Sequence, residues 1–361
     1  HFSRGNAMTP PDSGAGSLPE PATATAIGEL LERCGPTPAV DKLAALIEAG
    51  FDRLPLPGGG QTLDRWRALA AVAAHDLSLV KLYEGHTDAL AIRAELGDAP
   101  EESWTASWGV WAAEPPHARL YAQSRQDSRY TLRLDGRKAW CSGAASVSHA
   151  LVTCWQREDG GADRGPLLAA VAMNQSGVRV SDEGWQAVGM AESASVEVSF
   201  DGAEARLVGE LGAYVNRPGF WHGGAGIAAC WYGATAVLAE PLRQRIAQRP
   251  EPHAAAHLGA VDVALSRTAA LLRETAAEID RRPAAYAQLI ALRARAAAER
   301  TAGFVLDHVG RALGAAPFCQ HGDFARRAAD LPVFIRQCHA ERDLQTLGEL
   351  LAASREAPWT L

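Results

Sequence analysis

The sequence lacks several features that would assign a function class at once. It has no run of about 18 consecutive apolar residues, so no membrane span is predicted. It also has no long basic run, and its formal net charge is -7. Nucleic acids attract proteins through clustered positive charge, so this balance argues against a nucleic-acid partner.

Paired cysteines are missing as well. The chain has six cysteines, and none stands in a CxxC spacing. This pattern favours free thiols in a reducing compartment over a disulfide framework or a zinc site. We therefore expect a cytoplasmic protein. The first eight residues (1–8), HFSRGNAM, do not resemble a signal peptide and are interpreted as an expression scar.

The residues that are present predict an ordinary globular chain. Its 361 residues are 47% hydrophobic and 21% charged, enough for two or three subdomains that share a large core. From Ala26 to about Gly97, apolar residues recur at spacings of three and four, and Gly35 and Gly50 follow helical stretches as C-caps. These residues predict an N-terminal helical domain over 9–103.

The sequence pattern changes twice more along the chain. From Trp104 to about Gly209, short β-prone segments alternate with Gly, Asp and Asn, which predicts an antiparallel sandwich or barrel over 104–210. From Phe220 onward, four long helical stretches predict an up-and-down bundle within 211–361. The fold class is therefore α+β and multidomain, with crevices between the domains where small ligands bind.

One stretch of the β block stands out. Between Leu132 and Cys154, alternating residues run into Asp135-Gly136, Trp140 precedes Ser142-Gly143, and a second apolar strand follows. This pattern predicts a β-hairpin with a small polar site at its end.

Three segments resemble a known family, and the resemblance covers about Thr62 to Leu351. The segments are LDGRKAWCSGA at Leu134 to Ala144, then Trp185, Gly189, Met190, Ser193, Ser195, Val198 and Phe200, and finally Arg311-Ala312-Leu313-Gly314-Ala315. In these the chain resembles the acyl-CoA dehydrogenase family of flavoproteins. The resemblance implies an N-terminal helical domain, a middle antiparallel β domain and a C-terminal four-helix bundle. It also implies bound FAD and a homodimer or homotetramer that completes the flavin site.

The resemblance implies roles for individual residues. A flavin ring needs an apolar platform and hydrogen-bond partners, which Trp140 and Ser142, with the neighbouring backbone at Cys141, would provide. From the residues alone, Trp140 would equally suit a core and Ser142 a turn. The remaining implied cofactor contacts are the backbone of Trp111, Ala112 and Ala113, the turn at Gly314, and Arg245 or Arg243 near the flavin pyrophosphate of a neighbouring subunit.

The base that acyl-thioester dehydrogenation requires is missing. This reaction removes an α-proton and passes the β-hydrogen to the flavin, so the family places a glutamate near the substrate. Neither family position, around Arg336 to His339 or within Phe220 to Gly224, contains one. His339 and Glu341 are the candidate bases. His222 could face the flavin, whereas Cys338 fits a buried structural thiol better.

The predicted function is an FAD-dependent oxidoreductase that dehydrogenates an acyl thioester, bound to CoA or to a carrier protein, at its α,β-carbons. Electrons would pass to an electron-acceptor flavoprotein or to oxygen. The empty glutamate positions leave two alternatives open. One is a flavin-dependent monooxygenase on the same fold, and the other is a degenerate paralogue that binds flavin or an acyl carrier without catalysis.

Overall fold

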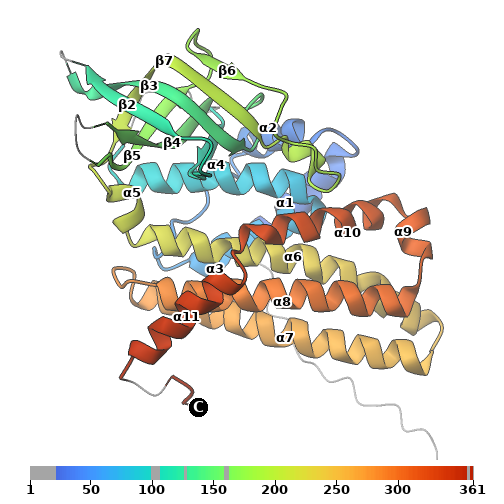
Figure 1. Cartoon of the computed structure of the whole chain (residues 1–361). Coiled ribbons are helices and arrows are strands. Elements are labelled where there is room, and N and C mark those ends of the chain that lie inside the picture. The colour runs from blue at the N-terminus through green and yellow to red at the C-terminus, as the bar shows by residue number, and fades with distance from the viewer. Residues whose placement is uncertain (1–21, 99–105, 126–127, 158–161, 356–357, 361) are drawn as a thin grey trace, which may run out of the picture.

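The computed structural model describes residues 22–98, 106–125, 128–157, 162–355 and 358–360. Figure 1 shows a β barrel at the top, helix α4 directly beneath it, and the long helices α6, α8 and α7 in layers below. The N-terminal helices are α1 (Ala22–Cys34), α2 (Ala39–Glu48), α3 (Thr62–His75) and α4 (Leu77–Glu95). The predicted glycine stops are confirmed, since Gly35 and Gly50 have φ values of 62° and 75°.

Seven strands form the β block. They are β1 (Trp108–Trp111), β2 (Leu120–Arg125), β3 (Ser128–Cys141), β4 (His149–Gln156), β5 (Arg164–Ala172), β6 (Val178–Val180) and β7 (Val196–Val208). Antiparallel pairs β2–β3, β3–β7, β7–β5 and β5–β4 form a ring. The ring closes where Tyr121 of β2 meets Trp155 of β4 in parallel. Strand β1 adds to β4, also in parallel, and β6 adds to β7.

The expected hairpin over 132–154 is wrong. Strand β3 continues through Asp135-Gly136, where the Asp135 carboxylate accepts a hydrogen bond from the Gly202 backbone N–H at 2.8 Å. Gly136 has a φ of 129°, and a Cβ there would lie 2.4 Å from the Arg119 carbonyl oxygen. These two residues therefore continue the strand instead of forming a turn, and the bulge lies opposite them at Gly202 of β7. Strand β3 pairs with β2 and β7, while β4 pairs with β5, β1 and β2, because barrel closure assigns them different partners.

The helical region that follows contains α5 (Ala213–Asn216), α6 (Gly219–Gln248), α7 (Pro252–Arg281), α8 (Gln288–Leu313), α9 (Ala316–Gln320), α10 (Gly322–Phe334) and α11 (Glu341–Ala353). The fourth long stretch of the sequence is thus divided. A 3₁₀ turn occupies Ile335–Gln337, three residues after Pro332, and Ala340 has a φ of 47°. Proline and the left-handed residue interrupt the helical hydrogen bonds there.

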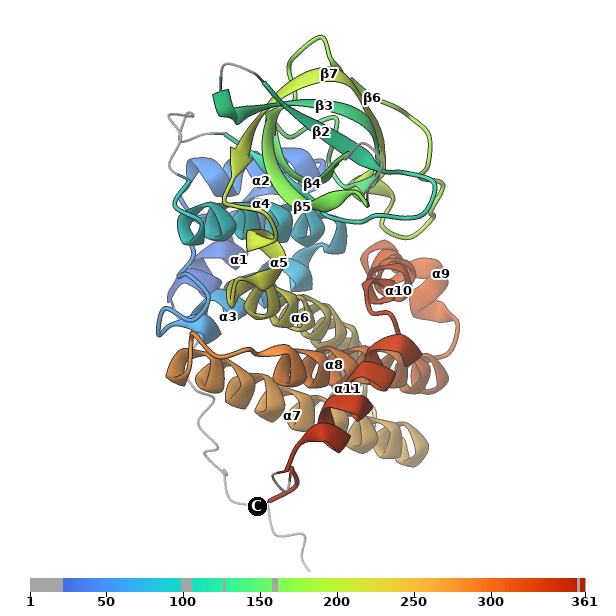
Figure 2. The ribbon, with the colours of Figure 1, turned by 60° about the vertical axis from the view of Figure 1, so that its left-hand side comes forward.

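The N-terminal helices and the bundle share one core. Helix α6 approaches α3 so closely that a Cβ at Gly233 would lie 2.3 Å from the Ala70 carbonyl oxygen. Trp66 and Trp231 are both buried in this core. Figure 2 shows α4 between the barrel and these helices. None of the helices in the described part of the chain combines the length and apolar character that crossing a membrane requires.

A buried histidine joins the N-terminal helices to the barrel. The Nδ1 atom of His86 accepts a hydrogen bond from the Trp108 backbone N–H at 3.1 Å. Its Nε2 atom therefore carries the proton and donates to the Asp52 carboxylate at 3.0 Å. His86 has no exposed surface, and Asp52 is 6% exposed. The imidazole thus ties the loop after α2, helix α4 and strand β1 together.

Replacing Asp52 with alanine would test this connection. We expect Asp52→Ala to lower the free energy of unfolding by about 2 kcal/mol, because the buried imidazole N–H loses its acceptor. Urea unfolding measures the change. Asp64→Ala is the matched control, since Asp64 pairs with Arg67 on a half-exposed surface and should cost less than about 0.5 kcal/mol. Equal losses in the two variants would contradict a special role for the Asp52–His86 bond.

Candidate functional site

Trp140 protrudes from the end of β3. Its side chain is 54% exposed, and its φ of 57° lies in the left-handed region. The cause is a β-bulge on β3. Lys138 pairs with Val198 and Cys141 with Val196, so two residues of β3 lie between these pairs where β7 has one. The extra residue turns the indole out of the barrel and Cys141 into its core. A large aromatic held at a strained position and left open to solvent is typical of a binding surface.

A chain of serine hydroxyls leads inward from beside Trp140. Ser142 Oγ lies 2.7 Å from Ser195 Oγ, which lies 3.1 Å from Ser193 Oγ, and Ser193 Oγ donates to the Met190 carbonyl oxygen at 2.9 Å. Each hydroxyl has one proton, and a carbonyl only accepts. The protons therefore point from Ser142 to Ser195 and from Ser195 to Ser193. The outward side of Ser142 Oγ is left with lone pairs alone.

The segment at the end of β1 lies behind this surface. The Trp111 indole N–H donates to the Ser142 carbonyl oxygen at 3.2 Å, and its ring is only 2% exposed. Trp111 therefore supports the Ser142 turn from within the barrel instead of offering its own surface. Ala112 and Ala113, which follow it, are half-buried.

A buried lysine fixes this segment to β3. Lys138 has no exposed surface, and its ammonium donates to Thr153 Oγ1 at 2.6 Å, to the Ala113 carbonyl at 3.3 Å and to Glu114 Oε1 at 3.4 Å. Burial lowers the pKa of Lys138, and the Glu114 carboxylate counteracts this in part. Glu114 also accepts from the Trp155 indole N–H at 2.8 Å. A lysine two residues before Trp140 thus holds the predicted backbone contacts in place.

The predicted contact at Cys141 is restricted to its backbone. The thiol is buried in the barrel, 3.5 Å from the Lys138 carbonyl oxygen, and burial raises the pKa of Cys141 to about 12. Such a thiol stays protonated and unreactive. All six cysteines, which lie within the described residues, are free.

Arg245 and Gly314 meet at the end of the bundle. Arg245 Nη1 donates to the Leu313 carbonyl oxygen at 3.2 Å, next to Gly314, which ends α8 with a φ of 71°. The Arg245 side chain is exposed, whereas Arg243 forms an ion pair with Glu240. Within the described part of the chain, no hydrogen bond links Arg245 to Trp140 or Ser142. The predicted cofactor residues therefore form two separate groups in one chain.

The two predicted bases lie on the surface. The side chain of His339 is 65% exposed, and its Nδ1 atom lies 3.3 Å from the Asp343 carboxylate. Glu341 is exposed at the first position of α11. The two candidate bases are thus placed in solvent and not inside a closed site. Cys338 is buried, as expected, with its thiol 3.5 Å from the Asp343 carboxylate.

His222 occupies the buried position instead. It is 2% exposed, and its Nε2 atom has no hydrogen-bond partner among the described residues. Together with Arg65, Glu84 and Asp88, it lines a small cavity between α3, α4 and α6. Burial lowers the pKa of His222 and raises that of Glu84.

The polar groups around His222 were not predicted from the sequence. Glu84 and Asp88 stand four residues apart in α4, and Lys81, three residues before Glu84, pairs with it. That spacing puts them on one face of α4, next to residues that pack in the core. These charged residues on the core-facing side of the helix could have indicated a polar site, because a buried charge needs a partner or a ligand.

Comparisons with known proteins establish the fold. The sequence matches no known family model and no curated protein. The structure is similar to that of TdsC from Paenibacillus sp. A11-2, solved with FMN and indole, with a TM-score of 0.77, 20% identity, and coverage of 93% of this chain and 98% of that chain. TdsC is described as a dibenzothiophene monooxygenase.

Two further solved structures are similar over nearly the whole chain. KijD3, solved with FMN and a dTDP-linked amino-keto sugar, has a TM-score of 0.77 and 17% identity, and the match covers 93% of this chain and 96% of KijD3. A nitrososynthase from Micromonospora carbonacea var. africana has a TM-score of 0.75 and 18% identity, with 92% and 94% covered. The predicted α+β fold class, with its helical, β and helical-bundle parts, is thereby confirmed.

The buried state of His222 predicts a pH dependence of stability. Because folding lowers its pKa, the unfolded chain binds more protons between the folded pKa and the ordinary value of 6.5. The contribution of neutral His222 is complete above that value and is lost as the pH falls below it. We expect wild type to lose stability relative to His222→Gln between pH 7.5 and pH 5, measured by urea unfolding across about five pH values.

The comparison with His222→Gln removes the effect of other histidines. His75 and His308 also have lowered pKa values, but both proteins contain them. The difference between the two profiles therefore reports His222 alone. Parallel profiles would show that the imidazole titrates equally in the folded and unfolded states.

Proposed function

We propose that the chain binds a flavin against Trp140 and Ser142 and acts as a flavin-dependent monooxygenase. The observation that carries the proposal is the exposed indole on its bulge beside a serine whose hydroxyl can only accept. The similar solved structures support it, because TdsC and KijD3 were solved with FMN and TdsC is described as a monooxygenase.

The residues at the barrel end fit a flavin ring. Trp140 offers an apolar face that is 54% exposed, large enough for a planar ring to lie against. Ser142 offers one oriented hydrogen bond, and the half-buried backbone at Ala112 and Ala113 would reach the pyrimidine edge, as the resemblance implies. Trp111 and Lys138 keep these contacts rigid. A rigid supporting layer is what a cofactor site requires.

The direction of the serine chain favours the reduced cofactor. Reduced flavin carries hydrogen on N5, whereas the N5 of oxidised flavin is an acceptor. Ser142 Oγ already donates its proton to Ser195, so it is set to accept from the reduced form. A reduced flavin supplies the electrons for oxygen chemistry. The cofactor is therefore proposed as a flavin that binds most tightly when reduced, and whether it is FAD or FMN is part of the test.

Acyl-thioester dehydrogenation receives less support. It needs a base positioned inside the site, and the two predicted bases are exposed on the surface. His339 interacts with Asp343, and Glu341 begins a helix that buries none of its residues. An acyl thioester as substrate therefore remains a prediction.

The second group of residues suggests how the site is completed. Arg245 and the Gly314 turn lie at the end of α6 and α8, without a link to Trp140 in the same chain. We therefore propose that they reach the cofactor of a neighbouring copy in a homodimer or homotetramer. The guanidinium keeps several donors for a phosphate group beyond its bond to Leu313.

Anaerobic titrations test the proposed function. We expect reduced FMN or FAD to bind about tenfold more tightly than the oxidised form, and Trp140→Ala to weaken both by about tenfold. A panel of acyl-CoAs should leave the bound flavin yellow under anaerobic conditions. The readouts are flavin absorbance and fluorescence.

Two results would contradict the proposal in different ways. If neither redox form of either flavin binds, the protein is not a flavoprotein. If an acyl-CoA bleaches the bound flavin without another reductant, the reaction is dehydrogenation.

Removing Ser195 would test the direction of the serine chain. In Ser195→Ala, Ser142 keeps its proton and can donate to oxidised flavin, so the preference for reduced flavin should fall about fivefold. The measurement is the ratio of the two dissociation constants. Ser181→Ala is the control. Ser181 Oγ donates to the Glu197 carbonyl oxygen and takes no part in the hydrogen bonds between Ser142, Ser195 and Ser193. An unchanged ratio in Ser195→Ala would show that Ser142 does not set the preference.

A further inference from the structure

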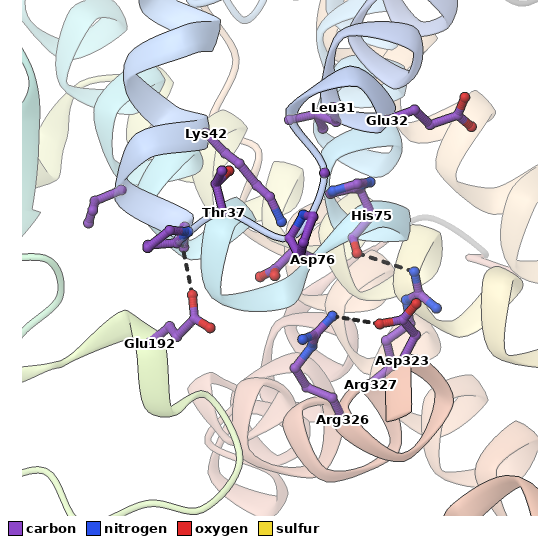
Figure 3. Close-up of a pocket in the computed structure, with 15 residues that line it drawn as sticks. Leu31, Glu32, Thr37, Lys42, His75, Asp76, Glu192, Asp323, Arg326 and Arg327 are labelled. Carbon is purple, nitrogen blue, oxygen red and sulfur yellow. Dashed lines mark hydrogen bonds and ion pairs between the residues drawn. The ribbon is translucent and has the colours of Figure 1, made fainter. Parts of the chain in front are cut away.

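A second cavity is lined by none of the residues proposed to contact the flavin at the barrel end. Its volume is about 730 Å³, within the range of small-molecule sites. Four segments surround it: the α1–α2 loop, the α3–α4 junction, the 3₁₀ turn η1 (Ala191–Ser193) and the start of α10. Figure 3 shows side chains from all four segments around one space.

Lys42 of α2 points into this cavity. The residue is only 5% exposed, and within the described part of the chain no hydrogen bond or ion pair engages its ammonium. Figure 3 shows the end of the side chain directed toward His75 and Asp76. The rest of the side chain is covered, so its ammonium meets solvent through the cavity. Lys42 is therefore a cation without a protein partner among the described residues, open to a ligand in the cavity.

Two arginines of α10 face the same space. Arg327 Nη2 donates to the His75 carbonyl oxygen at 3.2 Å, while its buried Nε has no partner among the described residues. Arg326 interacts with Asp323 at 3.0 Å near the solvent. Burial lowers the pKa of His75, Lys42 and the two arginines lower it further, and the Asp76 carboxylate counteracts this in part. Three cations thus converge around one neutral imidazole.

The acidic side chains of the cavity are already engaged. Asp76 accepts from the Leu79 backbone N–H at 2.8 Å, and Glu192 accepts from the Ala39 backbone N–H at 3.0 Å. Glu32 points away from the cavity in Figure 3. Each engaged carboxylate keeps a second oxygen that can accept from a hydroxyl group. The cavity therefore offers cationic donors from Lys42 and Arg327 and further acceptor oxygens from Asp76 and Glu192.

We propose that this cavity binds a small phosphate monoester with a hydroxyl-bearing body. The phosphate lies against Lys42 and Arg327, whose donors suit its oxygens. The hydroxyls face Asp76 and Glu192, and the apolar wall of Leu31 and Val40 covers the carbon skeleton. A carboxylate ligand would offer fewer oxygens to three converging cations. This site is separate from the proposed flavin surface and does not depend on it.

Thermal unfolding of the full chain, saturated with flavin, tests the site. The probes are AMP, ribose 5-phosphate and glycerol 3-phosphate, each paired with its dephosphorylated counterpart. We expect at least one phosphate to raise the melting temperature and its counterpart to leave it unchanged. Lys42→Met and Arg327→Gln should weaken binding of that phosphate about tenfold or more. Flavin added to saturation keeps phosphate binding at the flavin surface from contributing.

Arg281→Gln is the matched control. Arg281 is an exposed arginine paired with Glu274 on α7, outside the cavity, so its loss should leave phosphate binding unchanged. Circular dichroism confirms that each variant is folded. The proposal is overturned if no phosphate shifts the melting temperature below about 10 mM, or if both Lys42→Met and Arg327→Gln keep the full shift. Because no flavin signal is read, either result leaves the proposed flavin function untouched.

Discussion

A buried ammonium group organises the end of the barrel. Lys138 has no solvent contact, so its charge depends on Thr153, Glu114 and the Ala113 carbonyl. Removing an ion from water costs several kcal/mol unless such partners are in place. These bonds hold the segment after β1 in place against β3. They thereby also fix where Ala112 and Ala113 lie relative to Trp140 and Ser142. The proposed cofactor surface is rigid because the charge beneath it tolerates no other arrangement of its partners.

Helix α4 links this surface to the rest of the molecule. Its His86 joins the barrel strand β1 to the loop after α2, and its opposite face carries Glu84 and Asp88 toward His222. Most of the helix is buried, which a strongly amphipathic surface helix would not be. The barrel and the bundle therefore both pack against one shared helix. The barrel end and the α3–α4–α6 cavity are each built in part on it.

The sequence predicted what local rules decide and missed what long-range contacts decide. Gly35 and Gly50 ended their helices as expected, because a left-handed residue is a local signal. The hairpin at Asp135-Gly136 was wrong, since pairing with β2 and with the distant strand β7, which bulges at Gly202, keeps these residues inside a strand. At the site, motif resemblance selected Trp140 and Ser142, but neither the exposure of the indole nor the proton order of the serines follows from local pattern. His339 was placed by its position along the chain, and only the break after α10 shows that it faces solvent.

The bulge between Lys138 and Cys141 means that the number of residues in a strand decides which side chains face the proposed cofactor. Along a strand, successive side chains alternate between the two faces, so one residue more or less exchanges inside and outside for all that follow. Regular alternation from the inward-facing Lys138 would direct Trp140 into the barrel and Cys141 out of it, and the extra residue on β3 reverses both. One residue inserted into β7 between Val196 and Val198 would remove the mismatch and turn the indole inward. Evolution could therefore abolish or restore this surface by an indel in the partner strand, with no exchange of functional side chains.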